Sequence, residues 1–197
     1  MNGGRISNEE KESLSTYIGV GVLVLLAAIA IYYFFFLAKK EVSQIKGFDP
    51  NRPVQSDVVL RKRISAESFG IVREKRMETP FQNKYWDETG PGIYVDIITG
   101  EPLFSSVDKF DAGVGFPTFS KPISPDLVAE TLDTRFNMQR NEVQAKRSKA
   151  FLGHRFEEPK SPTGQRYTVN SGAFRFIPQE RMKDEGYESY LPLLEKK

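Results

Sequence analysis

The longest apolar run of the chain extends from Tyr17 to Ala38 and contains no charged residue. A bilayer core of about 30 Å needs roughly 20 residues at a helical rise of about 1.5 Å. A buried core helix is seldom apolar all round, and a cleaved signal peptide has a basic first region and a small-residue cleavage site. Here acidic residues outnumber basic ones in residues 1–16. The pattern predicts an N-terminal tail, residues 1–16, and one uncleaved transmembrane helix, residues 17–38.

Basic residues follow this helix closely and predict its orientation. Lys39, Lys40, Lys46 and Arg52 lie on its C-terminal side, and positive charge is retained on the cytoplasmic side of a membrane. We therefore expect a single-pass protein of the cell's inner, cytoplasmic membrane, with the N-terminus outside and the C-terminal domain in the cytoplasm. The three lysines are also expected to attract anionic lipid headgroups.

Residues 39–78 are predicted to form a basic juxtamembrane connector. Pro50 and Pro53 oppose a helix in its first half. Residues 58–77 mix apolar and basic side chains, so this part is expected to be partly ordered. The basic residues suit either a surface facing anionic lipid or a docking surface for an acidic partner.

From Thr79 to Lys197 the pattern changes to short apolar runs broken by Gly, Pro and Asp, which is typical of antiparallel sheets. The expected strands are GIYVDIITG, LFSS, NEVQAK, RYTVN and AFRFIP. Two other segments, SPDLVAETLD and PQERMKDEGYESYLPLL, are expected to be helical or irregular. The chain is thus predicted to end in a mostly-β domain, residues 79–197.

The stretch GQRYTVNSGAFRFIP carries a second pattern inside one of these strands. Arg166, Thr168 and Asn170 alternate with apolar residues, and in a strand a period of two places them on one face. A row of three such polar groups on a strand of the domain marks a candidate site.

Composition excludes several kinds of chemistry. The chain has no cysteine and one histidine, His154, which excludes disulfides, thiolate zinc sites, iron–sulfur clusters, thiol nucleophiles and a histidine-rich metal site. The net charge of +2 favours neither nucleic acid nor an acidic substrate. We expect no cofactor, no metal and no nucleic-acid partner.

Two longer blocks resemble the methionine sulfoxide reductase B family. They are TPFQNKYWDETGPGIYVDIITGEPLFSSVDKFDAGVGFPTFSKPI and FLGHRFEEPKSPTGQRYTVNSGAFRFIP. The family typically reads Y-W-D, G-I-Y, G-E-P-L-F-S-S, K-F-D-S-G-C/T-G-W-P-S-F, H-L-G-H-x-F and R-Y-C-x-N-S-x-x-L-R-F-I-P, in that order. The resemblance spans residues 79–194 and implies a compact domain of two antiparallel β-sheets with short peripheral helices.

The resemblance places Thr168 where the family has its catalytic cysteine, flanked by the family's arginine and asparagine at Arg166 and Asn170. In the family this thiolate attacks the sulfoxide sulfur, takes up its oxygen as a sulfenic acid, and is regenerated through a disulfide. A thiol has a pKa of about 8.5 that nearby cations lower. A threonine hydroxyl lacks this acidity and needs an activating base, and it cannot enter the thiol redox cycle.

Other family positions are exchanged as well. Val114 stands where many members have a resolving cysteine, Phe116 replaces the tryptophan that contacts the substrate's methyl group, and Phe151 replaces the first histidine of H-L-G-H, which leaves His154. The four positions that bind zinc in one branch of the family carry Asp96, Thr99, Ala145 and Ser148. A metal-free branch exists, so this last exchange alone does not imply inactivity. The other exchanges together predict a pseudoenzyme.

Two interpretations remain open for each retained residue. Arg166 and Asn170 are either remnants of a substrate site or partners of neighbouring backbone groups. His154 is either a hydrogen-bonded interior histidine or a ligand or acid–base group.

The function expected first is a membrane-anchored structural or interaction subunit. It would contact other membrane-protein subunits, such as those of a respiratory or photosynthetic complex, through Tyr17–Ala38 and through the C-terminal domain. The first alternative is a non-catalytic module that binds methionine or methionine sulfoxide through Arg166, Asn170, His154 and Phe116. The second is an enzyme, either a residual peptide-methionine (R)-S-oxide reductase or a hydrolase around Thr168 and His154.

Overall fold

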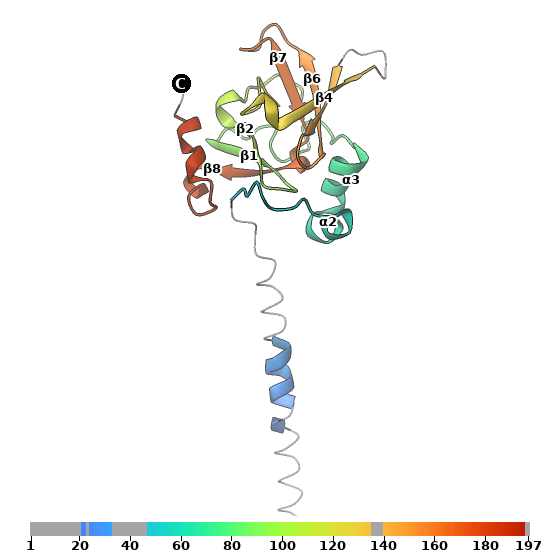
Figure 1. The fold of residues 1–197 in the computed structure, drawn as a ribbon, viewed down its shortest axis with the longest axis vertical. Coiled ribbons are helices and arrows are strands. Elements are labelled where there is room, and N and C mark those ends of the chain that lie inside the picture. Colours follow the sequence, from blue (N-terminus) through green and yellow to red (C-terminus); the bar gives the residue numbers. More distant parts are fainter. Residues whose placement is uncertain (1–20, 23, 33–46, 135–139, 196–197) are drawn as a thin grey trace, which may run out of the picture. The chain divides into compact units, whose positions relative to one another are not determined.

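The computed structural model describes residues 21–22, 24–32, 47–134 and 140–195 (Figure 1). The chain divides into two compact units, residues 1–44 and residues 45–197. In the first unit, residues 21–22 and 24–32 are helical. Half of the expected membrane helix, residues 17–38, lies outside the described residues. Within the described ranges no helix combines the length and the apolar character that a membrane span requires.

The second unit is built on two antiparallel sheets. The three-stranded sheet has the order β2-β1-β8 and the five-stranded sheet the order β3-β7-β6-β5-β4. The strands of the first are β1 (Gly92–Asp96), β2 (Pro102–Ser105) and β8 (Phe174–Pro178). The strands of the second are β3 (Thr118–Phe119), β4 (Val128–Asp133), β5 (Arg140–Ala145), β6 (Phe151–Glu157) and β7 (Gln165–Val169). The expectation of a mostly-β domain with two antiparallel sheets is confirmed.

The main core lies where aromatic side chains of both sheets meet. Phe104 on β2 stacks on Phe119 on β3, with ring centroids 4.6 Å apart, and Tyr94 on β1 meets Phe119 edge-on at 4.9 Å. Tyr167 and Val169 on β7 point into the same core cluster. Side chains alternate along a strand. Arg166 and Thr168, which alternate with Tyr167 and Val169, therefore lie on the opposite face of the five-stranded sheet.

Two short helices precede β1 and belong to this domain. They are α2 (Asp57–Arg63) and α3 (Ala66–Glu74), and α3 starts at Ser65, whose hydroxyl accepts a hydrogen bond from the Ser68 N–H. Their buried residues Leu60, Phe69, Ile71 and Val72 lie in the main core cluster. The segment expected as a connector, residues 39–78, therefore contributes two helices and core side chains.

The basic residues of these helices bond within the domain. Arg63 donates to the carbonyls of Ile97 and Ile98 at 2.8 and 2.6 Å. Arg73 donates to the Ser148 carbonyl at 3.1 Å and to the Asp57 carboxylate at 2.8 Å. Both guanidinium groups therefore stabilise the fold. Lys39, Lys40 and Lys46, which were expected near lipid headgroups, lie outside the described residues.

Two segments differ from their predicted structure. Residues 128–133, expected to be helical or irregular, form β4, because they pair with β5 over their whole length. Residues 151–157, for which no strand was predicted, form β6. The segment PQERMKDEGYESYLPLL is helical or irregular as predicted: it contains the 3₁₀ turns η5 (Gln179–Arg181) and η6 (Glu188–Leu193), beside a second core cluster that includes Met182 and Tyr187.

We expect α2 to be needed for the stability of the β-domain. In the fragment of residues 45–197, replacing the fully buried Leu60 by alanine is expected to lower the free energy of unfolding by about 2–5 kcal/mol, since a buried methyl-bearing side chain leaves a cavity. The matched control is Val58→Ala on the same helix, where the side chain is 70% exposed and the change should stay within about 0.5 kcal/mol. Urea unfolding followed by circular dichroism measures both. Equal effects of the two substitutions would contradict the placement of α2.

Candidate functional site

Polar side chains from neighbouring strands share the face of the five-stranded sheet that points away from the main core. His154 on β6 lies opposite Thr168 on β7, and Thr168 lies opposite Thr118 on β3. Glu142 on β5 lies opposite His154 on its other side. Directly opposite residues in an antiparallel sheet project to the same side. We refer to this surface as the polar face.

Thr168 is 6% exposed, and its hydroxyl is held by a neighbour on the same strand. Its Oγ1 accepts a hydrogen bond from Arg166 Nη1 at 2.7 Å. The Arg166 guanidinium also lies over the Phe156 ring, 4.6 Å from its centroid. In the part of the chain that the structure describes, no hydrogen bond joins the side chains of Thr168 and His154, so the hydroxyl has no base in contact.

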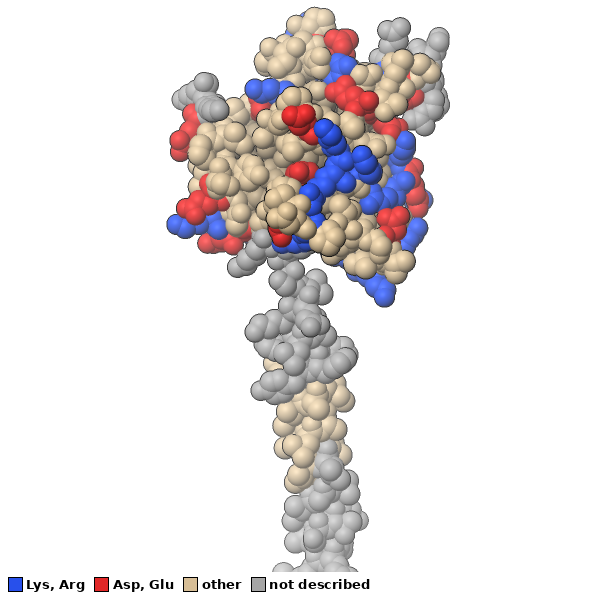
Figure 2. Space-filling view, viewed as in Figure 1, with Lys and Arg blue, Asp and Glu red and all other residues tan. Residues whose placement is uncertain are grey.

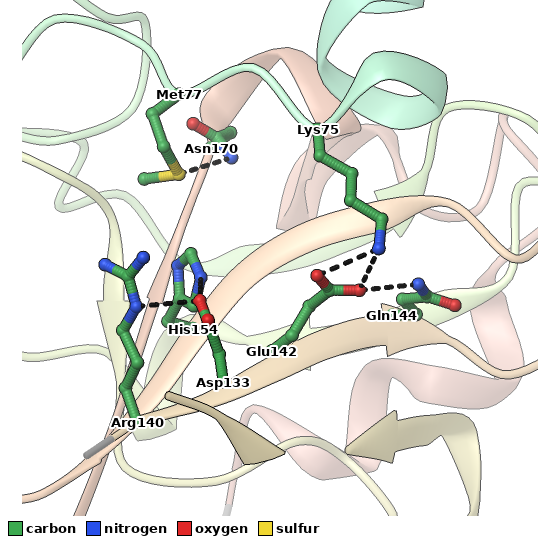
Figure 3. Close-up of polar contacts among 8 residues, drawn as sticks. All are labelled: Lys75, Met77, Asp133, Arg140, Glu142, Gln144, His154 and Asn170. Carbon is green, nitrogen blue, oxygen red and sulfur yellow. Dashed lines mark hydrogen bonds and ion pairs between the residues drawn. The ribbon is translucent and has the colours of Figure 1, made fainter. Parts of the chain in front are cut away.

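His154 is buried beside a carboxylate and a guanidinium (Figure 3). Its Nε2 lies 3.3 Å from Asp133 Oδ2, and Arg140 Nε donates to the same oxygen at 3.0 Å. Burial lowers the pKa of His154, Arg140 lowers it further, and Asp133 opposes both effects. The imidazole is therefore neutral at pH values near 7, where the carboxylate is already paired with Arg140.

Asn170, just after β7, is fully buried, and its side chain is bound to three residues in two other parts of the chain. Its Oδ1 accepts from the Glu78 N–H at 2.9 Å. Its Nδ2 donates to the Leu152 carbonyl at 3.1 Å and to Met77 Sδ at 3.5 Å (Figure 3). The amide oxygen and both amide hydrogens are thus engaged by the chain itself.

The segment Lys75–Glu78 follows α3 and lies at the edge of the polar face, where both of its ends are bound to other parts of the domain. We call this segment the strap. At its start, Lys75 Nζ lies 2.7 and 3.0 Å from the two Glu142 oxygens. At its end, the Glu78 carboxylate accepts from the Ser171 and Gly172 N–H groups at 2.5 and 2.8 Å. Next to Lys75 and Glu142 an open groove of about 400 Å³ continues along β4 and β5.

The apolar exchanges lie around the same strands. Phe151 is buried, and its ring meets the His154 ring edge-on with centroids 5.5 Å apart. Val114 and Phe116 are half-buried on either side of Gly115, in the loop that leads into β3, and the following carbonyl, that of Pro117, accepts from the Val169 N–H at 3.0 Å. The structure therefore brings the positions predicted from the sequence to β6, β7 and one adjoining loop.

The four positions compared with zinc ligands lie in two turns. Asp96 and Thr99 belong to the β1–β2 turn, Ala145 and Ser148 to the β5–β6 turn. Asp96 Oδ2 accepts from Thr99 Oγ1 at 2.7 Å and Oδ1 from the Ile98 N–H at 3.0 Å. Burial raises the pKa of Asp96, against hydrogen bonds from Ile98, Thr99 and Ser148. The two turns thus meet through hydrogen bonds. In the described ranges no three His, Asp or Glu side chains are placed to hold a metal ion.

Several residues of this region were missed by sequence reasoning. Glu142 alternates with core residues in NEVQAK and could have been assigned to the polar face from that period. Asp133 stood in a segment expected to be helical or irregular. Lys75, Met77 and Glu78 lie in the expected connector, where no periodic pattern links them to β5 or β7.

The fold and the polar face define a class of protein. It is a two-sheet β-domain in which Thr168 shares one face of a sheet with Arg166 and His154 and is followed by the buried Asn170. The chain matches the model of the SelR domain over residues 64–178, which is more than half of its length. It belongs to this family, that of methionine sulfoxide reductase B.

The single histidine allows a direct test of the site's electrostatics. We expect the NMR titration midpoint of His154 to lie below the ordinary value of about 6.5, because burial and Arg140 disfavour the charged ring. The unfolded chain then binds more protons than the folded chain just below about pH 6.5, so the free energy of unfolding falls as the pH is lowered through that region.

The control is His154→Gln, which should lose less stability between about pH 7.5 and about pH 5.5 than the unchanged protein. A midpoint above the ordinary histidine value would show that Asp133 dominates the environment of the ring.

Proposed function

We propose that this chain is a membrane-anchored, non-catalytic member of its family that serves as a structural or interaction subunit of a larger membrane-protein complex. The proposal rests on the contacts that Thr168 and Asn170 make in the candidate site. The nucleophile position is a buried threonine held by Arg166, and the amide of Asn170 is engaged by Met77, Glu78 and Leu152.

The absence of catalysis follows from the chemistry of the hydroxyl. Reduction of a sulfoxide in this family needs a sulfur nucleophile that takes up oxygen and is then regenerated by a second thiol. Thr168 Oγ1 cannot form a sulfenic acid, and the chain has no other thiol to replace it. His154, whose Nε2 lies 3.3 Å from Asp133, makes no hydrogen bond to that hydroxyl in the described part of the chain and so is not placed to activate it.

The anchoring part of the proposal rests on the apolar run Tyr17–Ala38. In its described part, apolar side chains of the helix are exposed: Val24 at 64%, Leu25 at 61% and Ile31 at 57%. A surface of this kind is costly in water and suits contact with lipid or with another apolar helix.

The domain also presents an aromatic side chain suited to a protein partner. Phe81 is 54% exposed and has a left-handed backbone conformation with φ of 61°, which is strained for a bulky residue. Its N–H donates to the Gly115 carbonyl at 2.8 Å, and its ring meets Trp86 edge-on at 5.3 Å. Exposed aromatic residues held in one geometry are common anchors of protein interfaces.

The charged residues on the face of the domain shown in Figure 2 suit a partner whose surface carries both positive and negative groups. Figure 2 shows Lys and Arg side chains gathered on part of this face, with Asp and Glu side chains beside them. A nucleic-acid surface would instead carry a continuous basic stripe. This pattern supports a protein partner.

One observation favours the alternative of a methionine-binding module. The contact between Asn170 Nδ2 and Met77 Sδ shows that the site accommodates a thioether. That thioether belongs to the chain itself, so a methionine from another protein would have to displace the strap. Titration with an oxidised-methionine peptide distinguishes the two functions, because the structural subunit should give no heat at millimolar peptide.

Restoring the thiol alone is expected not to restore a reductase. Thr168→Cys places a thiol beside Arg166, but Val114 supplies no resolving thiol and Phe151 supplies no second histidine. Catalytic groups that act together are strongly non-additive. We expect at most one turnover, trapped as a sulfenic acid, in a thioredoxin-coupled assay with a methionine-(R)-sulfoxide substrate. Sustained turnover by Thr168→Cys, or turnover by the unchanged protein that Thr168→Ala abolishes, would contradict the proposal.

A larger complex should survive mild detergent extraction of the native protein. We expect the full chain to migrate with defined membrane-protein partners, and the fragment of residues 45–197 to bind the same partners more weakly, because it lacks the helix and the proximity that anchoring provides. Native electrophoresis followed by mass spectrometry measures both. A discrete monomer without partners would argue against a structural subunit, and undiminished binding of the fragment would show that the helix contributes no contact.

A further inference from the structure

The strap places one methionine in an unusual position. The chain has four methionines, of which Met77 and Met182 lie in the described residues. Met182 is fully buried in the second core cluster, whereas Met77 is 44% exposed. Met77 is therefore open to solvent while its sulfur is held by a fully buried amide, that of Asn170.

The strap fixes this sulfur more firmly than a surface loop would. Two residues before Met77, Lys75 is paired with Glu142, and directly after it Glu78 is bound by Asn170, Ser171 and Gly172. A free methionine side chain has three rotatable bonds and samples many positions. Here the residues on both sides are held in place, which restricts the Met77 side chain and favours the contact of its sulfur with the Asn170 amide.

We propose that Met77 is an oxidation site of defined stereochemistry, at which peroxide forms one sulfoxide epimer in excess. The Asn170 side-chain amide donates to the sulfur and so engages one of its lone pairs, whereas the hydrogen bond leaves the second lone pair free to react with an oxidant that reaches this partly exposed residue. The oxidant is hydrogen peroxide or an organic hydroperoxide. The exposed lone pair attacks one peroxide oxygen, the O–O bond breaks and an S–O bond forms. The proton of the transferred oxygen passes to the leaving oxygen, so that methionine loses two electrons and the peroxide is reduced to water or, for an organic hydroperoxide, to the alcohol.

The expected size of the preference follows from the hydrogen bond. Attack at the shielded lone pair first requires the amide contact to break, and a net hydrogen bond is worth about 0.5–1.5 kcal/mol. Such a difference between two barriers corresponds to an epimer ratio between about two and about ten to one. A methionine that was merely exposed would give equal amounts of both epimers.

The oxidised side chain would persist in this protein. Its own site has Thr168 in place of a reducing thiol, so a separate sulfoxide reductase is needed to reverse the modification. The added oxygen converts a half-exposed apolar side chain at the edge of the polar face into a polar one. Met77 would thus record exposure of the strap to peroxide. This proposal does not depend on the proposed function, because its test involves no turnover and no partner.

The experiment treats the full chain in detergent with dilute hydrogen peroxide. Mass spectrometry follows oxidation of the tryptic peptide that begins at Met77, and epimer-specific sulfoxide reductases then assign its configuration. Met182 in the same sample is the buried control, Met77→Leu identifies the modified peptide, and the urea-unfolded chain supplies the unbiased epimer ratio. In parallel, NMR observes the side-chain amide of Asn170.

The expected result has three parts. In the folded chain Met77 oxidises at least about ten-fold faster than Met182, because a buried sulfur is reached only by opening. One epimer exceeds the other by at least about two to one, and the ratio returns to one in urea. The Asn170 amide signal moves when Met77 is oxidised. Equal epimers in the folded chain, an unchanged Asn170 signal, or equal oxidation of Met77 and Met182 would each overturn the proposal.

Discussion

The buried side-chain amide of Asn170 is the interaction on which the arrangement of the site depends. It joins β6 through the Leu152 carbonyl, the strap through the Glu78 N–H and Met77 sulfur, and the end of β7 through its own backbone. A buried amide that lost one of these partners would leave a polar group unsatisfied, at a cost of about 1–3 kcal/mol. The strap is therefore part of the folded domain, and its position over the polar face is fixed by the same residue that flanks the catalytic position in the family.

A second polar cluster connects the two turns that bind zinc in one branch of the family. Asp96 accepts hydrogen bonds from its own turn, and Arg73 reaches the opposite turn at the Ser148 carbonyl. Arg63 adds two bonds to carbonyls of the β1–β2 turn. Since both arginines come from α2 and α3, these helices tie the turns together while their apolar sides fill the core. The basic residues that looked like a lipid-facing surface in the sequence have in these two cases a structural role.

Sequence reasoning identified the strands that contain several buried apolar residues. β1, β7 and β8 belong to this group, because all five residues of β1 are buried and the other two strands place apolar side chains in the core. β4 could not be identified in the same way. Four of its central positions are half-buried or exposed, so its strand structure is determined by pairing with β5, which the residues of β4 alone do not reveal.

For a similar reason, only part of the candidate site could be predicted from the sequence. Arg166 and Thr168 lie on a strand whose alternation points to one surface, whereas His154 was assigned to the site only by the family resemblance, because no strand was predicted for its segment. Asp133 and Glu142 join them through the register of β4, β5 and β6, and Lys75 joins them through the path of the chain after α3. Contacts of this kind depend on tertiary geometry and have no local signal in the sequence.

The substituted Thr168 and the retained His154 and Asn170 have one physical property in common. A threonine bound by its neighbouring arginine, a histidine beside an aspartate that an arginine also binds, and an asparagine bound by the strap all obtain their partners from within the chain. An enzyme of this family must keep such groups available for its substrate, and doing so carries a cost in unsatisfied polar groups. Here Thr168 and Asn170 are bound within the chain, so their hydrogen bonds contribute to the stability of the domain. Part of the cost remains, because His154 Nε2 and Arg166 Nε are buried without a hydrogen-bond partner in the described residues.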